Sequence, residues 1–127
     1  MYIAVVSLEV DDVDRAIAFY TEKLGWDKTA DVPMGPDMRW VTLAPIGEKT
    51  AFTLQKREKP LDPEDRFAGV VLEVADVHAA YELLAKEGVR FAEPPRNEPW
   101  GGWASFEDSE GNVIGVHSPA HGGANAN

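Results

Sequence analysis

A short internal repeat constrains the fold more than any other feature, because a repeat decides how the elements of a chain are organised. Residues 6–16 align without a gap onto residues 70–80, and seven of the eleven positions are identical. The identical pairs are Val6/Val70, Leu8/Leu72, Glu9/Glu73, Val10/Val74, Asp12/Asp76, Val13/Val77 and Ala16/Ala80. Only two copies fit, so the pattern predicts a duplicated half-domain and not a solenoid.

Each copy begins with a pattern typical of a strand followed by a helix. Apolar residues alternate at positions 6, 8 and 10, and again at 70, 72 and 74, which is the period of two of a strand with unlike faces. Apolar residues at helical spacing then follow in both copies. Each helix is expected to start after an aspartate N-cap and to end at a glycine, namely Asp12 with Gly25 and Asp76 with Gly88.

Three further strand-like runs follow each helix. They cover residues 26–30, 38–44 and 51–56 in the first half and residues 89–92, 103–107 and 113–117 in the second. The sequence therefore predicts an α+β fold with two tandem βαβββ modules, 1–56 and 68–118, in one domain spanning 1–118. A charged, proline-bearing linker is expected at 57–67, and a flexible tail at 119–127.

The composition excludes several classes of function. Acidic residues outnumber basic ones by 22 to 12, giving a formal charge of -10 that would repel a nucleic-acid backbone and attract cationic ligands. The same acidity could instead serve solubility alone. The chain has no cysteine, which excludes disulfides, thiolate zinc sites and cysteine nucleophiles. The apolar run Met1–Val6 is too short for a signal peptide or membrane span, so we expect a cytoplasmic protein without membrane contact.

The duplication and several local motifs together resemble the vicinal oxygen chelate superfamily, which contains glyoxalases, bleomycin-resistance proteins and extradiol dioxygenases. The motifs are residues 8–20, 23–26, 72–81, 87–89 and 106–112. The last is close to the family's usual Asp-Pro-Asp-Gly-Asn turn, with Ser109 and Glu110 as departures. The resemblance implies curved mixed sheets around a groove, a small-molecule ligand and usually a homodimer.

The metal positions of the superfamily carry no suitable ligands in this chain. In metal-dependent members, His, Glu or Gln side chains from the first and last strands of each half chelate a divalent ion that holds two substrate oxygens. The matching positions here are Val5, Thr53, Gly69 and Gly115. A register shift of two residues would give Ser7, Gln55, Val71 and His117, of which only two are plausible ligands. We therefore expect no metal and no other cofactor.

Polar residues are nevertheless expected to face the groove. The period of two places Ser7, Glu9, Thr53, Gln55, Glu73 and His117 on the groove side of their strands. Glu9 and Glu73 could bind a cation, or one could act as a general base. Alternatively, these glutamates are solvated or paired with Arg39, Arg66 or Arg96, and His117 is only a residue at a strand end.

Tryptophans supply a second indication of ligand binding. Trp40, Trp100 and Trp103 could line the groove and hold a flat cation by stacking and cation–π attraction. Packing in the core or in a hairpin is the alternative for Trp100 and Trp103.

Three functional hypotheses follow from the sequence. The first is a metal-independent protein that sequesters an aromatic or cationic small molecule, as in antibiotic resistance of the bleomycin-resistance type. The second is an enzyme of the superfamily, a lyase, isomerase or dioxygenase, that uses Glu9, Glu73 and His117 with a divalent ion, or as acid and base without one. The third is a small-molecule sensor or partner subunit without chemistry.

Overall fold

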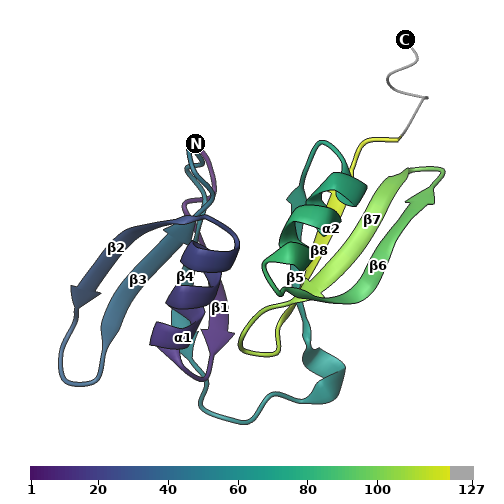
Figure 1. Ribbon diagram of the computed structural model, residues 1–127. Coiled ribbons are helices and arrows are strands. Elements are labelled where there is room, and N and C mark those ends of the chain that lie inside the picture. The colour runs from purple at the N-terminus through teal and green to yellow at the C-terminus, as the bar shows by residue number, and fades with distance from the viewer. Residues whose placement is uncertain (121–127) are drawn as a thin grey trace. The chain divides into compact units, whose positions relative to one another are not determined.

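The computed structural model describes residues 1–120, and the chain divides into two compact units between Pro60 and Leu61. Each unit contains one four-stranded mixed sheet with a helix across one face (Figure 1). The order of elements is β-α-β-β-β in both units, interrupted only by short π and 3-10 turns. The predicted α+β fold with two βαβββ modules is therefore confirmed.

The first unit contains a sheet with the strand order β1-β4-β3-β2. Strand β1 is parallel to β4, and the other neighbours are antiparallel. The elements are β1 (Val5–Val10), α1 (Val13–Ala18), the π-helical turn η1 (Phe19–Lys23), β2 (Asp27–Pro33), β3 (Arg39–Ala44) and β4 (Ala51–Lys56).

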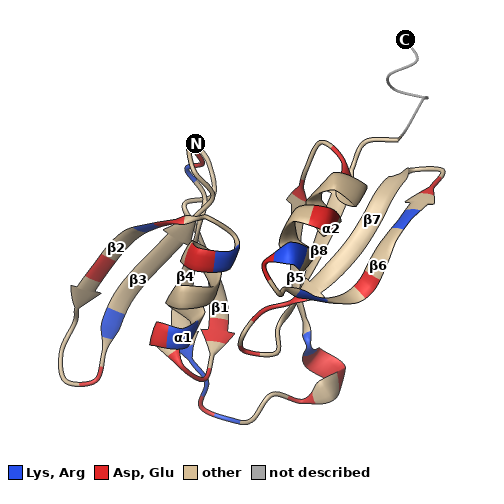
Figure 2. Ribbon diagram, viewed as in Figure 1, with Lys and Arg blue, Asp and Glu red and all other residues tan. Residues whose placement is uncertain are grey.

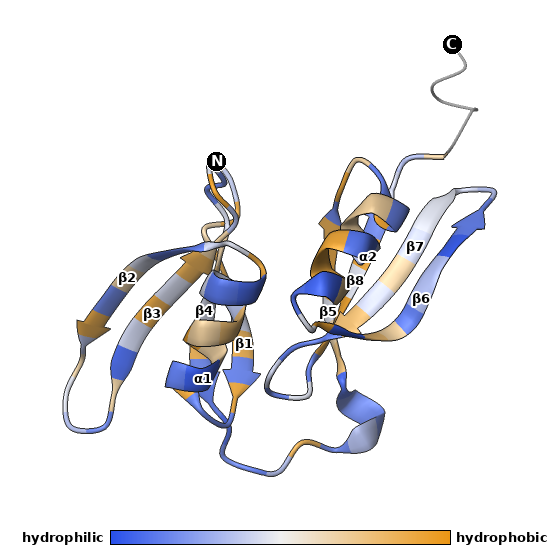
Figure 3. Cartoon of the chain, viewed as in Figure 1, coloured by the Kyte–Doolittle hydropathy of each residue, from blue (hydrophilic) through white to orange (hydrophobic). Residues whose placement is uncertain are grey.

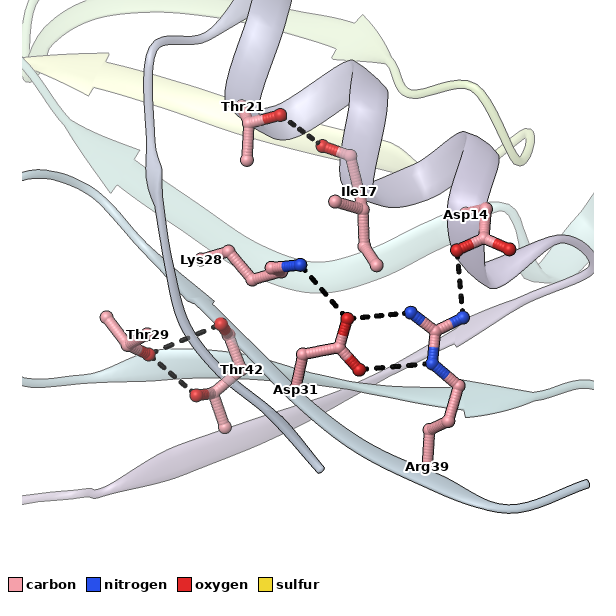
Figure 4. Close-up of polar contacts among 8 residues, drawn as sticks. All are labelled: Asp14, Ile17, Thr21, Lys28, Thr29, Asp31, Arg39 and Thr42. Carbon is pink, nitrogen blue, oxygen red and sulfur yellow. Dashed lines mark hydrogen bonds and ion pairs between the residues drawn. The ribbon is translucent and has the colours of Figure 1, made fainter. Parts of the chain in front are cut away.

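Helix α1 begins as predicted but changes its geometry before it ends. The Asp12 side chain caps it by accepting a hydrogen bond from the Arg15 backbone N–H at 3.0 Å. From Phe19 the chain continues as a π-helical turn, in which the Thr21 hydroxyl donates to the Ile17 carbonyl at 2.7 Å (Figure 4). Phe19 and Tyr20, the first two residues of this wider turn, are both buried.

Alternation along the strands directs the apolar residues of the first unit toward α1. Leu8, Val10, Val41 and Leu43 are buried. Hydrophobic and hydrophilic positions alternate visibly along β3 (Figure 3). The Phe52 ring meets the Tyr20 ring edge-on, with 5.6 Å between centroids, which places Phe52 on the helix side of β4. Its neighbour in the strand, Thr53, consequently lies on the opposite face.

The second unit repeats this arrangement with the strand order β5-β8-β7-β6. Its elements are the 3-10 turn η2 (Pro63–Asp65), β5 (Phe67–Glu73), α2 (Val77–Lys86), β6 (Arg90–Glu98), β7 (Gly101–Glu107) and β8 (Val113–Ser118). Asp76 caps α2 by accepting from the His78 backbone N–H at 2.8 Å. Ala104, Phe106, Ile114 and Val116 are buried, as is Val77 of the helix.

Some boundaries differ from the sequence-based expectation. Strand β6 continues to Glu98, past the expected end at residue 92, because register shifts on either side of Glu93 let Pro94 and Pro95 lie in an edge strand. Strand β2 likewise reaches Pro33, past residue 30. The region expected to be a linker contains η2 and the first residue of β5, and most of the expected tail, including His121, lies outside the described residues.

Charged residues occur along the helices, edge strands and loops of both units, with acidic residues in the majority (Figure 2). None of the helices in residues 1–120 combines the length and apolar character that crossing a membrane requires.

Candidate ligand-binding site

One face of the second sheet brings together several residues that the sequence singled out. The Ser118 hydroxyl accepts from the Val77 backbone N–H of α2 at 3.3 Å, so Ser118 lies on the helix side of β8. His117, one residue earlier, points to the opposite face. The strand register places His117 between Glu73 of β5 and Trp103 of β7. These three residues form a row across the sheet.

His117 is held by contacts at both ring nitrogens. Its Nδ1 lies 2.6 Å from Glu73 Oε1, and its Nε2 lies 3.4 Å from the Trp100 carbonyl oxygen. The imidazole also stacks on the Trp100 ring, with 5.9 Å between centroids and 12° between planes. The hydrogen bond with Glu73 raises the pKa of His117 above its ordinary value. The Glu73 side chain is 61% exposed, so this ion pair lies at the surface.

A second carboxylate holds the Trp103 indole. Trp103 Nε1 donates to Glu93 Oε1 at 3.0 Å, and the Ser105 hydroxyl donates to the same oxygen at 2.9 Å. Arg96 completes the arrangement, with its Nη1 3.1 Å from Glu93 Oε2. The hydrogen bonds from Trp103, Arg96 and Ser105, in that order of effect, lower the pKa of Glu93. Trp100 meets Trp103 nearly edge-on, with 6.2 Å between ring centroids.

The metal position expected in β8 is covered by an aromatic ring. A Cβ atom at Gly115 would lie 2.5 Å from Trp103 Cη2, so the indole occupies the space where a ligand side chain would project. Glycine at position 101 similarly allows close approach to His117, since a Cβ there would lie 2.6 Å from His117 Nε2. Position 115 therefore does not fit a metal ligand, because the Trp103 indole takes the space that a side chain there would need.

The first unit carries a related row on the face turned away from α1. Ser7, Thr53 and Thr42 are neighbours across β1, β4 and β3. Two residues further along, Glu9 pairs with Gln55. Continuing the antiparallel register of β3 and β4 by two residues places Trp40 beside Gln55.

The two rows correspond to each other through the internal repeat. Glu9, Gln55 and Trp40 occupy the places that Glu73, His117 and Trp103 occupy in the second unit. The sequence-predicted residues thus form two groups: Ser7, Glu9, Trp40, Thr53 and Gln55 in the first unit, and Glu73, Trp100, Trp103 and His117 in the second.

Glu73, one of the two glutamates singled out in the sequence, pairs with His117. The three arginines considered as partners contact other carboxylates: Arg39 contacts Asp14 and Asp31, Arg66 contacts Glu107, and Arg96 contacts Glu93 and Glu98.

Sequence reasoning missed the residues that support Trp103. Alternation along 103–107 would have placed Ser105 on the same face as Trp103, which was a usable signal. Glu93 reaches this face through the irregular register of β6, and no periodic pattern in the sequence predicts its position there.

The donor set for a metal ion is incomplete. In residues 1–120, no group of three or more His, Cys, Asp or Glu side chains is arranged to hold one. Val5, Thr53, Gly69 and Gly115 offer a single hydroxyl between them, and Gly69 lies in an irregular part of β5 with a φ of 77°. These residues do not fit the divalent ion of the metal-dependent superfamily members.

Comparisons with known proteins agree with this architecture. Residues 2–116 match the family model described as the Glyoxalase/Bleomycin resistance protein/Dioxygenase superfamily. YetH of Bacillus subtilis (strain 168) is 36% identical over 112 residues, which cover 88% of this chain and 93% of that protein.

Two solved structures show the same fold at substantial sequence identity. One is TnmS3, an antibiotic binding protein from Streptomyces sp. CB03234, with a TM-score of 0.81 and 36% identity over 94% of this chain and 97% of that chain. The other is a superfamily member from Sphaerobacter thermophilus DSM 20745, with a TM-score of 0.82 and 31% identity over 93% and 97%.

Proposed function

The chain belongs to the glyoxalase/bleomycin resistance protein/dioxygenase superfamily, and on that premise we propose that it is a metal-independent protein that sequesters a flat aromatic cation, an antibiotic being the leading candidate. The observation that carries the proposal is the cluster of Trp100, Trp103, His117 and Glu73 on one face of the second sheet. TnmS3, which is 36% identical to this chain, is an antibiotic binding protein, and this supports an antibiotic as the ligand.

The chemistry of this cluster suits a planar, positively charged molecule. Trp100 is 53% exposed, so its ring can accept a stacked partner, and aromatic faces attract cations. The Glu73 carboxylate adds a negative charge beside the rings, and the net charge of -10 favours the approach of cations. His117 loses its proton above its raised pKa, and the pair of Glu73 and His117 then carries a net negative charge. Cation binding is therefore expected to strengthen at pH values above that pKa.

A direct experiment uses 9-aminoacridine, a fluorescent planar cation, titrated into the full chain. We expect saturable binding and a rise in melting temperature. Trp100→Leu is expected to weaken binding about fivefold, since a stacked aromatic pair contributes on the order of 1 kcal/mol. Glu82→Gln, a charge change on the exposed surface of α2, is the matched control and should leave the affinity unchanged. Absence of binding by the wild-type chain would contradict the proposal.

An enzymatic role is a second candidate, because the distance of 2.6 Å between His117 Nδ1 and Glu73 Oε1 is that of a base oriented by a carboxylate. Such a pair could remove a proton next to a carbonyl group. The test is deuterium uptake by dihydroxyacetone in D₂O, monitored by NMR, with His117→Gln as the comparison. Uptake that depends on His117 would favour catalysis over sequestration.

Homodimer formation is also a prediction, resting on the family resemblance. Size-exclusion chromatography with light scattering checks it, and a mass of one chain across the working concentration range would contradict it.

A further inference from the structure

The His117 imidazole itself occupies the place in the second unit that suits a planar cation. It stacks on Trp100 with 12° between the ring planes, and its Nδ1 lies 2.6 Å from Glu73 Oε1. A ligand of the proposed class needs the same two contacts, an indole face and the carboxylate beside it. A protonated imidazole is a small planar cation. The protein's own side chain therefore makes the contacts that such a ligand would make.

The turn before β7 is shaped to admit this imidazole. A Cβ atom at Gly101 would lie 2.6 Å from His117 Nε2, so a side chain at that position would collide with the ring. The same nitrogen lies 3.4 Å from the carbonyl oxygen of Trp100. Backbone on both sides of the turn thus contributes to the stack, which is more than a chance contact between two surface side chains.

Glu73 is the charged residue that faces the imidazole directly. In the strand register, β5 presents Glu73 on one side of His117, and β7 presents Trp103 on the other. Beyond Trp103, the charged residues of β6 pair among themselves, Arg96 with Glu93 and with Glu98. The hydrogen bond with Glu73 raises the pKa of His117, which means that the pair is stronger when the ring carries its proton.

The imidazole can leave this place without disturbing the core. The His117 side chain is 27% exposed and the Glu73 side chain 61% exposed, so a rotamer change can carry the ring into solvent. A ligand on the opposite face of Trp100 would be separated from Glu73 by the indole. A ligand that takes the place of the imidazole instead gains the indole face and the carboxylate together.

We infer that His117 is an internal competitor, which a ligand must displace from Trp100 and Glu73 in order to bind. This inference rests on the proposed binding function and adds a specificity-determining residue to it. Because the competitor is tethered to the site, its effective concentration is high, and a ligand succeeds only if it stacks over a larger area than an imidazole does. Fused-ring cations are therefore favoured over single-ring cations, and the competition is strongest at acidic pH.

The experiment measures the affinity of the full chain for 9-aminoacridine at about pH 5.5 and about pH 8.5, on either side of the ordinary pKa of histidine. The probe keeps its positive charge at both. His117→Gln, which removes the competing ring, is expected to bind about fivefold more tightly than wild type at the lower pH and to lose most of the pH dependence. His78→Gln is the matched control, because it removes a histidine of α2 on the other side of the sheet and should keep the wild-type affinities.

A second measurement tests the displacement in the wild-type chain. Nuclear Overhauser effects between the imidazole protons of His117 and the indole protons of Trp100 are expected in the free protein and should disappear at saturation with 9-aminoacridine. If the probe binds but these effects persist, or if His117→Gln binds no more tightly than wild type at the lower pH, the competition is rejected and the proposed function stands. If the probe binds neither chain at either pH, the proposed function fails and the competition with it.

Discussion

The Trp103 indole lies directly over Gly115, so closely that a Cβ atom at position 115 would come within 2.5 Å of Trp103 Cη2. The opposite edge of the indole is held by the hydrogen bond from Nε1 to Glu93. Two features therefore position the ring: the absence of a side chain at Gly115 of β8 and the carboxylate of Glu93 in β6. This contact explains physically why glycine stands at a position where metal-dependent relatives carry a ligand.

Adding a methyl group at this contact should displace the indole. Gly115→Ala is expected to lower the free energy of unfolding by about 1–3 kcal/mol, because the ring must leave its place and its bond to Glu93. In a Trp103→Leu background the same substitution should cost much less, and urea unfolding of the four chains in a double-mutant cycle measures the difference. If the losses of unfolding free energy caused by Gly115→Ala and Trp103→Leu simply add in the double mutant, the contact between the two residues is contradicted.

The pairing of His117 with Glu73 predicts a titration that one substitution should move. Glu73 raises the pKa of His117 above 6.5, so Glu73→Gln should bring it back toward that value. A raised pKa in the folded state means that the pair contributes stability below about pH 6.5, and that this stability is lost as the pH rises through the higher value. NMR titration of the imidazole signals, assigned with His117→Gln, measures the shift.

One outcome of the same titration would contradict the pairing. A pKa of His117 that is equal in wild type and Glu73→Gln would show that the 2.6 Å contact does not form in solution.

Much of the fold was predictable because its determinants are local and repeated. The alternation at 6–10 and 70–74 and the caps Asp12 and Asp76 specify strand and helix within a few residues of chain. The π-helical turn at Phe19 was not predictable from the apolar stripe, because its register depends on packing of Phe19 and Tyr20 in the core.

The candidate site was predictable only where it follows strand alternation. The faces of Glu73, His117 and Trp103 follow from the period of two. The contact between His117 and Trp100 depends on the turn between β6 and β7, and the role of Glu93 depends on irregular register in β6, so neither has a periodic signature.

An ion-pair network joins α1 to the first sheet and should give a measurable acid sensitivity. Arg39 contacts Asp14 of α1 at 2.8 Å and Asp31 of β2 at 2.7 Å, and Lys28 contacts Asp31 at 3.0 Å (Figure 4). The hydrogen bonds from Arg39 and then Lys28 lower the pKa of Asp31 from 3.8 to about 2. The stabilisation is therefore present above pH 3.8 and lost as the pH falls toward 2.

Asp31→Asn should remove that acid-dependent stability. We expect a loss of about 1 kcal/mol in the free energy of unfolding at neutral pH, since ion pairs near the surface contribute little. The difference from wild type should shrink as the pH falls below 3.8, as urea unfolding across this range would show. Asp14→Asn, whose side chain is 80% exposed, should have a smaller effect. Equal pH profiles for wild type and Asp31→Asn would contradict the network.

Metal removal should leave ligand binding intact. The superfamily's ligand positions carry Val5, Thr53, Gly69 and Gly115 here, and the Trp103 ring covers the last of them. Dialysis against EDTA is therefore expected to change the 9-aminoacridine affinity by less than about twofold. Added nickel, zinc, manganese or ferrous ions should not raise the melting temperature, whereas an ion at a hundred times its Kd would stabilise a real site by about 2.7 kcal/mol. Stoichiometric metal in the purified chain, lost together with binding on EDTA treatment, would show that other residues supply ligands and would favour the enzymatic alternative.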